Sequence, residues 1–421
     1  MRVDLARLSP EVAVVVGAVR EAHGTNHAEL DHQLTRPLDA QRLVTVSRRH
    51  AATPAVHAAL ARRDHHVAHE LRRVLDGPAQ ASRLRALALA GDLIRIVDTL
   101  RNAGVETLAY KGPVAAAGLY GDLAAREFVD LDLLVRPADV RRAVAIMERE
   151  GYAPVFPVNS KQMSFLLRHG HDRKFVRGDE VVEIQWAIAE RSHAVPRDPA
   201  VWFERSRLVP LGAAQIRTLS RHDELLISSL HGALHLWGRL SWMTDMAAAL
   251  AGLDDPVTDT ANVLAAARRA RVRRMFLSGP AMAARVVGTV LPRPLADAID
   301  ADEALGRTVA RLTDAALGPD GPATFAARDQ LGLRLSLKDT GIAKATEAVR
   351  AIATPTLSDW HAVRMPEVLW PLYYPLRLGR LVARYVVGSR SPGDWWMADA
   401  EPGVELPAGR PAASPSGRIA P

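Results

Sequence analysis

The first 80 residues place their apolar side chains at helical spacing and show no alternating pattern typical of strands. LSPEVAVVVGAVREA (8–22) offers Ser9 as an N-cap and Pro10 for the first helical turn. TPAVHAALARR (53–63) begins with a similar Thr-Pro pair. We therefore predict an N-terminal helical segment over residues 1–80.

Residues 81–195 alternate between helical stretches and short apolar runs. LIRIVDTLRNAG (93–104) and PADVRRAVAIMEREG (137–151) each have one apolar helical face and end at a glycine. Strands are predicted in VETLAY (105–110), FVDLDLLV (128–135), DRKFVRG (172–178) and EVVEIQWAI (180–188). Gly178-Asp179 is expected to form the turn between the last two. This order predicts a small α/β core with a mixed sheet.

Residues 196–395 again favour helices, including DELLISSLHGALHLWGRLSWMTDMAAAL (223–250). Near the end of this region, Arg377, Arg380 and Arg384 follow helical spacing. We interpret them as a solvated or partner-facing surface, with binding of an anionic lipid or RNA as the alternative.

The predicted fold is α+β and mostly α. A small mixed-sheet core (81–195) lies between the N-terminal helices and a C-terminal helical domain (196–395). Residues 396–421 are rich in Pro, Ala, Gly and Ser, which predicts a disordered tail.

Composition narrows the classes of protein without choosing one. The formal charge is +7, but basic residues are scattered among 47 acidic ones, which permits an anionic substrate without demanding one. The absence of cysteine excludes disulfides, thiolate zinc sites and cysteine nucleophiles. Because no apolar stretch of about 18 residues occurs, we expect no membrane span and a cytoplasmic protein.

Two aspartates interrupt the apolar run REFVDLDLLV (126–135). In a strand, Asp130 and Asp132 share one face, because side chains alternate with a period of two. The intervening residues are expected to face a core: Val129, Leu131, Leu133 and Val135. Two buried carboxylates require compensation, and Mg²⁺ prefers such hard oxygen ligands. The alternative is a strand edge with solvated carboxylates, which the apolar neighbours disfavour.

Two nearby motifs extend this interpretation. Glu183 lies on a predicted neighbouring strand and would supply a third carboxylate, allowing two ions that stabilise phosphoryl displacement. The Lys111-Gly112 turn lies one element earlier, before a helix that starts at Pro113. Glycine permits close backbone approach, and a helix start favours anions.

These motifs resemble the polymerase-β-type nucleotidyltransferase superfamily, and more narrowly an uncharacterised bacterial nucleotidyltransferase family within it. The similarity lies in YKGPVAAAGLYGDLAAREFVDLDLLVRPADVRRAVAIMEREGY (110–152), VEIQW (182–186) and LHGALHLWGRLSWMTD (230–245). It implies a Mg²⁺-dependent (or Mn²⁺-dependent) enzyme that transfers a nucleoside monophosphate from an NTP such as ATP to an acceptor oxygen.

The resemblance also implies roles for individual residues. Asp130, Asp132 and Glu183 would bind Mg²⁺, and Glu183 would act as a base or orient the acceptor. Gly112 would mark the triphosphate-binding turn, and Lys111 and Arg126 would neutralise phosphate oxygens. The alternative for Arg126 is a structural ion pair with Glu127 or Asp122.

Two positions depart from the family pattern. Pro113 follows Gly112 where Ser or Gly is usual, which removes a hydroxyl and an N–H donor. Gln185 stands where the narrower family often has His, and an amide cannot exchange a proton near neutral pH. These departures support an alternative function, a protein that binds nucleotide or a partner without turnover.

A D-x-D glycosyltransferase is a further alternative, although it would need a larger nucleotide-binding sheet before the D-x-D. The base of the NTP and the oligomeric state stay open, and the acceptor could be a small molecule, a nucleic-acid end or a protein side chain.

Several histidines have spacings that deserve interpretation. His231 and His235, and likewise His65 and His69, are four residues apart, a spacing that can bind zinc. Because neither pair has an evident third ligand, we interpret them as structural or surface residues. His231 and Asp245 are also candidates to line a nucleotide cleft, since the helical domain of such enzymes usually closes over the base. We interpret His169 and His171 as residues of a solvated loop, with contact to the acceptor as the alternative.

Overall fold

The computed structural model describes residues 2–24, 27–188, 199–318, 327–353, 359, 363 and 365–386. The chain divides into two compact units, Met1–Arg350 and Ala351–Pro421. Helices predominate and one small mixed sheet lies in the first unit, so the predicted α+β, mostly α class is confirmed.

Described residues before the sheet form helices, as predicted. In chain order these are η1 (Leu5–Arg7), α1 (Pro10–Ala22), α2 (His27–Leu34), α3 (Ala40–Arg49), α4 (Thr53–Ala61) and α5 (His66–Asn102). Ser9 and Pro10 begin α1 as expected. Helix α5 continues through residue 80, and the proposed domain boundaries stay predictions.

The central sheet has five strands in the order β1-β2-β5-β4-β3. These are β1 (Thr107–Tyr110), β2 (Leu131–Val135), β3 (Ala153–Pro154), β4 (Asp172–Arg177) and β5 (Glu180–Gln185). Strands β2 and β5 are parallel and the other pairs are antiparallel. Gly178, with φ 57°, forms the expected turn between β4 and β5. Strand β2, which carries Asp132 of the D-x-D motif, lies between β1 and β5 and is therefore not an edge strand.

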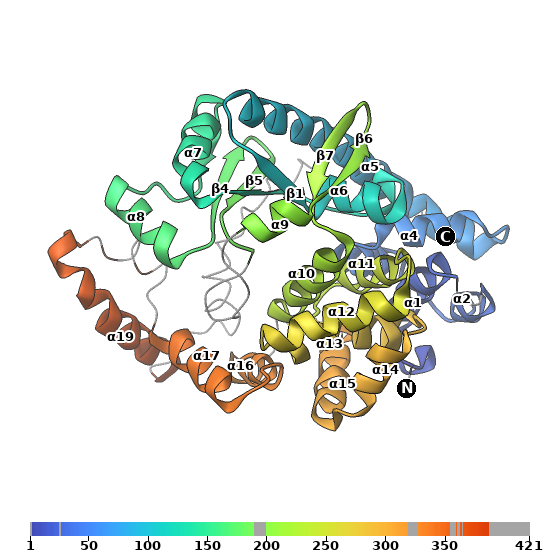
Figure 1. Cartoon of the computed structure of the whole chain (residues 1–421). Coiled ribbons are helices and arrows are strands. Elements are labelled where there is room, and N and C mark those ends of the chain that lie inside the picture. The colour runs from blue at the N-terminus through green and yellow to red at the C-terminus, as the bar shows by residue number, and fades with distance from the viewer. Residues whose placement is uncertain are drawn as a thin grey trace, which may run out of the picture. The chain divides into compact units, whose positions relative to one another are not determined.

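One face of the sheet packs on helices α5 and α7 (Figure 1). Leu131, Leu133 and Val135 of β2 join Leu100 of α5 and Val144 of α7 in this core. The connecting elements are α6 (Gly112–Ala115), π-helix η2 (Ala116–Tyr120), η3 (Leu123–Ala125), η4 (Pro137–Asp139), α7 (Val140–Arg149) and α8 (Ser160–His169).

The opposite face of the sheet contributes Leu108, Tyr110 and Leu134 to a second core built mainly from helices. On β2, side chains alternate between the two faces, so the polar residue Asp132 points towards this helical side. The helical elements that follow the sheet in the chain are α9 (Ala200–Arg205), α10 (Arg221–Leu234), α11 (Leu240–Ala251), α12 (Pro256–Arg269), α13 (Arg273–Met282), π-helix η6 (Ala283–Val287), α14 (Arg293–Asp300), α15 (Glu303–Leu317), α16 (Ala327–Ser336) and α17 (Gly341–Ala353).

A β-hairpin lies within the region expected to be mostly helical. Strands β6 (Arg207–Leu211) and β7 (Ala214–Thr218) pair antiparallel, and β7 contacts β1 (Figure 1). Val209 and Ile216 are buried among more exposed neighbours, an alternation that is typical of strands. Gly212, with φ 60°, forms the turn.

The second unit contains η8 (Glu367–Leu372) and α19 (Tyr373–Val386). Arg377 is buried and donates to Asp359 over 3.1 Å, and Arg380 also binds Asp359. The expectation of a solvated surface is therefore wrong for Arg377, because an internal carboxylate binds it. The Arg384 side chain and the predicted tail (396–421) lie outside the described residues. Among described helices, none combines the length and apolar character needed to cross a bilayer.

Candidate active site

Four polar side chains lie in one row across neighbouring strands of the central sheet. Tyr110 of β1 lies opposite Asp132 of β2, which lies opposite Glu183 of β5. Glu183 in turn lies opposite Lys174 of β4. Directly opposed residues point to the same side of a sheet. The register therefore gathers two carboxylates between a tyrosine and a lysine.

Asp130 lies just before the sheet, so the predicted strand over 128–135 is wrong at its start. Strand β2 begins at Leu131. Val129, expected in the core, is 44% exposed, because the chain has not yet entered the sheet at that position. Leu131 and Leu133 are buried as predicted, and Asp132 is 3% exposed on the opposite side.

The carboxylates of the row are held by cations and by an amide. Lys111 Nζ lies 3.4 Å from Asp132 Oδ1, and Lys174 Nζ lies 3.1 Å from Glu183 Oε1. Gln185 Nε2 donates to Asp132 Oδ1 over 2.7 Å and to Glu183 Oε2 over 2.9 Å. Two of the five lysines in the chain thus contact the acidic pair.

The pKa values of the carboxyl groups show that the two lysines do not neutralise all of the negative charge at this site. Burial raises the pKa of Asp132 well above its usual range, an effect that Lys111 offsets in part. Burial and the nearby Glu183 also raise the pKa of Asp130. Burial alone would raise the pKa of Glu183, but Lys174 and Lys111 outweigh it and hold that pKa at about 2. Three carboxylates share two ammonium groups, and Asp132 is the least stable as an anion.

The chemistry of this donor set fits a divalent cation. Asp130, Asp132 and Glu183 offer the hard oxygen ligands that Mg²⁺ prefers, and the raised pKa of Asp132 indicates a need for positive charge. Within the described ranges, however, no three His, Asp or Glu side chains form a ready-made metal cluster. As they stand, the three carboxylates therefore do not surround one common point.

The turn before α6 has an unusual backbone. Lys111 has φ 58° and ψ −156°, a region that is essentially reserved for glycine, and Gly112 has φ 46°. A Cβ atom on Gly112 would lie 3.3 Å from the backbone carbonyl oxygen of Asp130. The glycine thus permits the turn to pack against the first aspartate. Pro113 follows without an N–H group, which limits the backbone donors that an anion could use.

Arg126 is engaged in a buried ion pair. Its Nε lies 3.0 Å and 2.9 Å from the two carboxylate oxygens of Asp245, and Tyr120 OH donates to the same carboxylate over 2.9 Å. The side chains of Arg126 and Asp245 are 10% and 9% exposed. Arg126 does form a structural ion pair, but the expected partners Glu127 and Asp122 are wrong, because the partner is Asp245. Both bonds use Nε, so the pair gives Arg126 a buried structural partner, and its role in phosphate binding stays a prediction.

Two histidines and a tryptophan form an aromatic cluster on the helical side. The His231 and His235 rings are 4.5 Å apart, and Trp242 lies 5.3 Å and 5.4 Å from them. Arg239 lies over the Trp242 ring at 5.8 Å. Burial lowers the pKa of His235 to about 4, and the charge of Lys111 adds to this effect, so the ring is neutral at pH 7. A role for His231 in lining a nucleotide cleft stays a prediction.

The other histidines considered in the sequence analysis, His65, His69 and His171, make local contacts. His65 Nδ1 accepts from the Ala68 N–H and caps α5, while His69 binds Asp64 over 3.0 Å. His171 contacts Asp172 at 3.5 Å. The structural interpretation of His65 and His69 agrees with these contacts, and the His169 side chain lies outside the described residues.

Comparison with known proteins gives one match. A family model described as "uncharacterised nucleotidyltransferase" matches residues 36–288, more than half of the chain. The chain belongs to this family. Neither the curated proteins nor the solved structures include a match. Membership supports a general nucleotidyl-transfer activity, and the matched range of the nucleotidyltransferase contains the whole acidic row and the Arg126–Asp245 pair.

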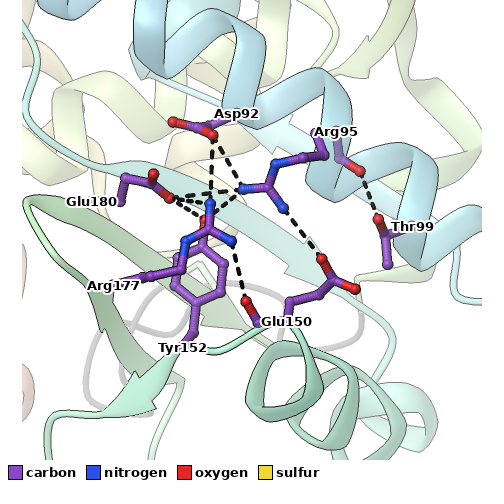
Figure 2. A network of polar contacts seen from close by, with 7 residues as sticks. All are labelled: Asp92, Arg95, Thr99, Glu150, Tyr152, Arg177 and Glu180. Atoms are coloured by element: carbon purple, nitrogen blue, oxygen red, sulfur yellow. Dashed lines mark hydrogen bonds and ion pairs between the residues drawn. The ribbon is translucent and has the colours of Figure 1, made fainter.

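A polar network on the face of the central sheet opposite to the acidic residues holds the β4–β5 hairpin, which carries Glu183 (Figure 2). Arg95 of α5 donates to Tyr152 OH over 2.9 Å, and Tyr152 donates to Glu180 over 2.5 Å. Arg177 binds the same Glu180 carboxylate over 2.8 Å and the Glu150 backbone over 3.1 Å. Glu180 and Arg177 flank the β4–β5 turn, so the network anchors both strands to α5.

Sequence reasoning missed two members of the row. Lys174 alternates with the buried Phe175 on a strand that was itself predicted, and this alternation was a usable signal. Tyr110 gave no signal, because an aromatic residue at a strand end is ordinary. Only the register shows that both side chains lie beside the carboxylates.

Proposed function

We propose that this protein transfers a nucleoside monophosphate from an NTP to an acceptor oxygen in a reaction that depends on Mg²⁺ or Mn²⁺. The acceptor oxygen would form a bond to the α-phosphorus, the bond from that phosphorus to the bridging oxygen would break, and pyrophosphate would leave. The observation that carries the proposal is the direct opposition of Asp132 and Glu183 on parallel strands in a nucleotidyltransferase-family chain.

The acidic residues have distinct tasks in this proposal. Asp130, Asp132 and Glu183 would hold the cation, which when bound neutralises charge on the reacting phosphates. With a pKa of about 2, Glu183 stays ionised and is a weak proton acceptor near neutral pH. This favours a role in binding and orientation over a role as the general base.

The cationic residues would neutralise the triphosphate. Arg126 is bound to Asp245 and Pro113 lacks an N–H group, so Lys111 is the best-placed member of the predicted phosphate-binding set. With a cation held by Asp132, the Lys111 ammonium would be available to neutralise phosphate charge. Catalysis would then rest on positioning and charge neutralisation.

A second candidate function is binding of a nucleotide or partner without turnover. The contacts that favour it are those of Lys111, Lys174 and Gln185, which already bind the carboxylates of Asp132 and Glu183. Calorimetry that shows NTP binding, with no pyrophosphate released across a panel of acceptors, would support this candidate. A glycosyltransferase is disfavoured because the described residues before β1 form helices rather than a nucleotide-binding sheet.

Differential labelling tests the proposed reaction. The full chain is incubated with Mg²⁺ or Mn²⁺, a lysate of its host and each NTP, labelled at either the α- or the γ-phosphate. Nucleotidyl transfer predicts acceptor label from the α-position only. Label from the γ-position would indicate phosphoryl transfer, and label from neither, with nucleotide bound, would favour the binding protein.

A further inference from the structure

Gln185 occupies an unusual position among the buried polar groups of the sheet. It lies two residues after Glu183 on β5, so both side chains point to the same face. Gln185, Asp132 and Tyr110 are 4%, 3% and 4% exposed. A buried amide with this little access to water needs protein partners for its polar atoms.

The partners of Gln185 fix the orientation of its amide. Tyr110 OH donates to Oε1, while Nε2 donates to Asp132 Oδ1 over 2.7 Å and to Glu183 Oε2 over 2.9 Å. The reverse orientation would direct the amide oxygen at the carboxylate oxygens of Asp132 and Glu183, and the amide N–H groups at the Tyr110 hydroxyl. Tyr110 therefore selects the orientation in which both N–H bonds reach acidic groups.

The same contacts bring the two carboxylates together. The amide and Lys111 both bind Oδ1 of Asp132, and the Asp132 carboxyl group also hydrogen-bonds to Glu183. Lys174, rather than the amide, binds the Oε1 of Glu183. A neutral double donor can thus align two carboxylates without adding a charge that would compete with a cation. A histidine at this position could donate only one N–H bond to the pair.

We propose that Gln185, oriented by Tyr110, is the positioning residue that aligns Asp132 and Glu183 to bind a divalent cation. This inference rests on the proposed function, because it assumes that these carboxylates are cation ligands. Hydrogen bonds to ligating carboxylates tune metal affinity, and their loss typically weakens binding by about 10–100-fold.

Direct Mn²⁺ binding tests the inference without an assay of catalysis. Electron paramagnetic resonance titrations of the full chain give the Kd for Mn²⁺ in the wild type and in five variants: Asp132→Asn, Gln185→Leu, Gln185→His, Tyr110→Phe and the Tyr110→Phe/Gln185→Leu double variant. Gln185→Leu should weaken Mn²⁺ binding about 10–100-fold. Gln185→His and Tyr110→Phe should lie between it and the wild type.

The double variant separates positioning from folding. Gln185→Leu alone leaves the Tyr110 hydroxyl buried without its acceptor, whereas the double variant removes both polar groups. A folded double variant, verified by circular dichroism, should still bind Mn²⁺ as weakly as Gln185→Leu. Wild-type Kd values in both would overturn the role of Gln185, provided that Asp132→Asn loses binding. If the wild type binds no better than Asp132→Asn, the cation site fails, and the proposed function and this inference fail together.

Discussion

The guanidinium of Arg126 binds the carboxylate of Asp245 at 2.9 Å, across 119 residues of sequence. Arg126 lies just before the acidic strand, and Asp245 lies in α11. The pair therefore fastens the approach to the candidate site onto the helical side of the same unit. An arginine that we predicted from the family resemblance to bind phosphate thus has a structural partner.

Breaking this pair should destabilise the protein. Arg126→Leu leaves the Asp245 carboxylate buried and uncompensated, for which we expect a loss of about 3–5 kcal/mol in the free energy of unfolding. Urea denaturation measures the loss. The Arg126→Leu/Asp245→Asn double variant should recover part of it, because the amide carries no charge and can still accept from Tyr120. Equal losses in the single and double variants would contradict an ion pair as the source.

Lys174 should stabilise the folded state through Glu183. The depressed pKa of Glu183 means that this contribution is present above the ordinary value near 4.5 and is lost as pH falls towards 2. Lys174→Met should lower the free energy of unfolding at pH 7 by about 1–3 kcal/mol, at roughly 1.4 kcal/mol for each unit by which the pKa rises.

The difference between this variant and the wild type should shrink as the pH falls, because Glu183 becomes protonated earlier without Lys174. Denaturation curves between pH 7 and pH 3 measure the trend. Lys161→Met, an exposed lysine change in α8, is the matched control and should show no such trend. A constant difference at every pH would show that Lys174 acts by packing rather than through charge.

His50 should make stability fall in mild acid. Burial, aided by the positive charges of Arg49 and Arg239, lowers the pKa of this fully buried histidine to about 3. Below pH 6.5, the ordinary pKa of histidine, His50 binds a proton in the unfolded chain but stays neutral in the folded chain. Stability therefore declines as pH falls. The expected loss between pH 6.5 and pH 5 is about 1.5 kcal/mol.

His50→Gln should flatten this part of the stability profile, whatever its effect at pH 7. Thermal or urea denaturation at several pH values gives the comparison. His66→Gln changes an exposed histidine and should leave the slope intact. An unchanged slope in His50→Gln would assign the acid sensitivity to other groups.

Local pattern was sufficient to predict much of the sheet. The apolar alternation around Leu131 and Leu133 indicated a strand with one buried face, and Gly178 marked the hairpin turn. These patterns span only a few residues, so they can be read without knowing which strands pair with each other. The β6–β7 hairpin carried a similar alternation at Val209 and Ile216, which the prediction of a helical region overlooked.

Long-range relationships were not predictable in the same way. The register that opposes Asp132 to Glu183 pairs residues 51 positions apart in the sequence, and the pattern within each strand does not determine that pairing. The partner of Arg126 lies in a distant helix for the same reason. Val129 was misplaced because an apolar residue can precede a strand as readily as begin it.

The central claim is that the acidic row carries nucleotidyl transfer, and one comparison tests it most directly. Incorporation of α-phosphate label into acceptor is measured for the wild type, Asp130→Asn and Asp132→Asn, with Asp179→Asn in the exposed turn of the β4–β5 hairpin as control. We expect both aspartate variants to lose transfer while circular dichroism shows an intact fold, and the control to match the wild type. Wild-type incorporation by Asp130→Asn and Asp132→Asn would contradict the proposed chemistry.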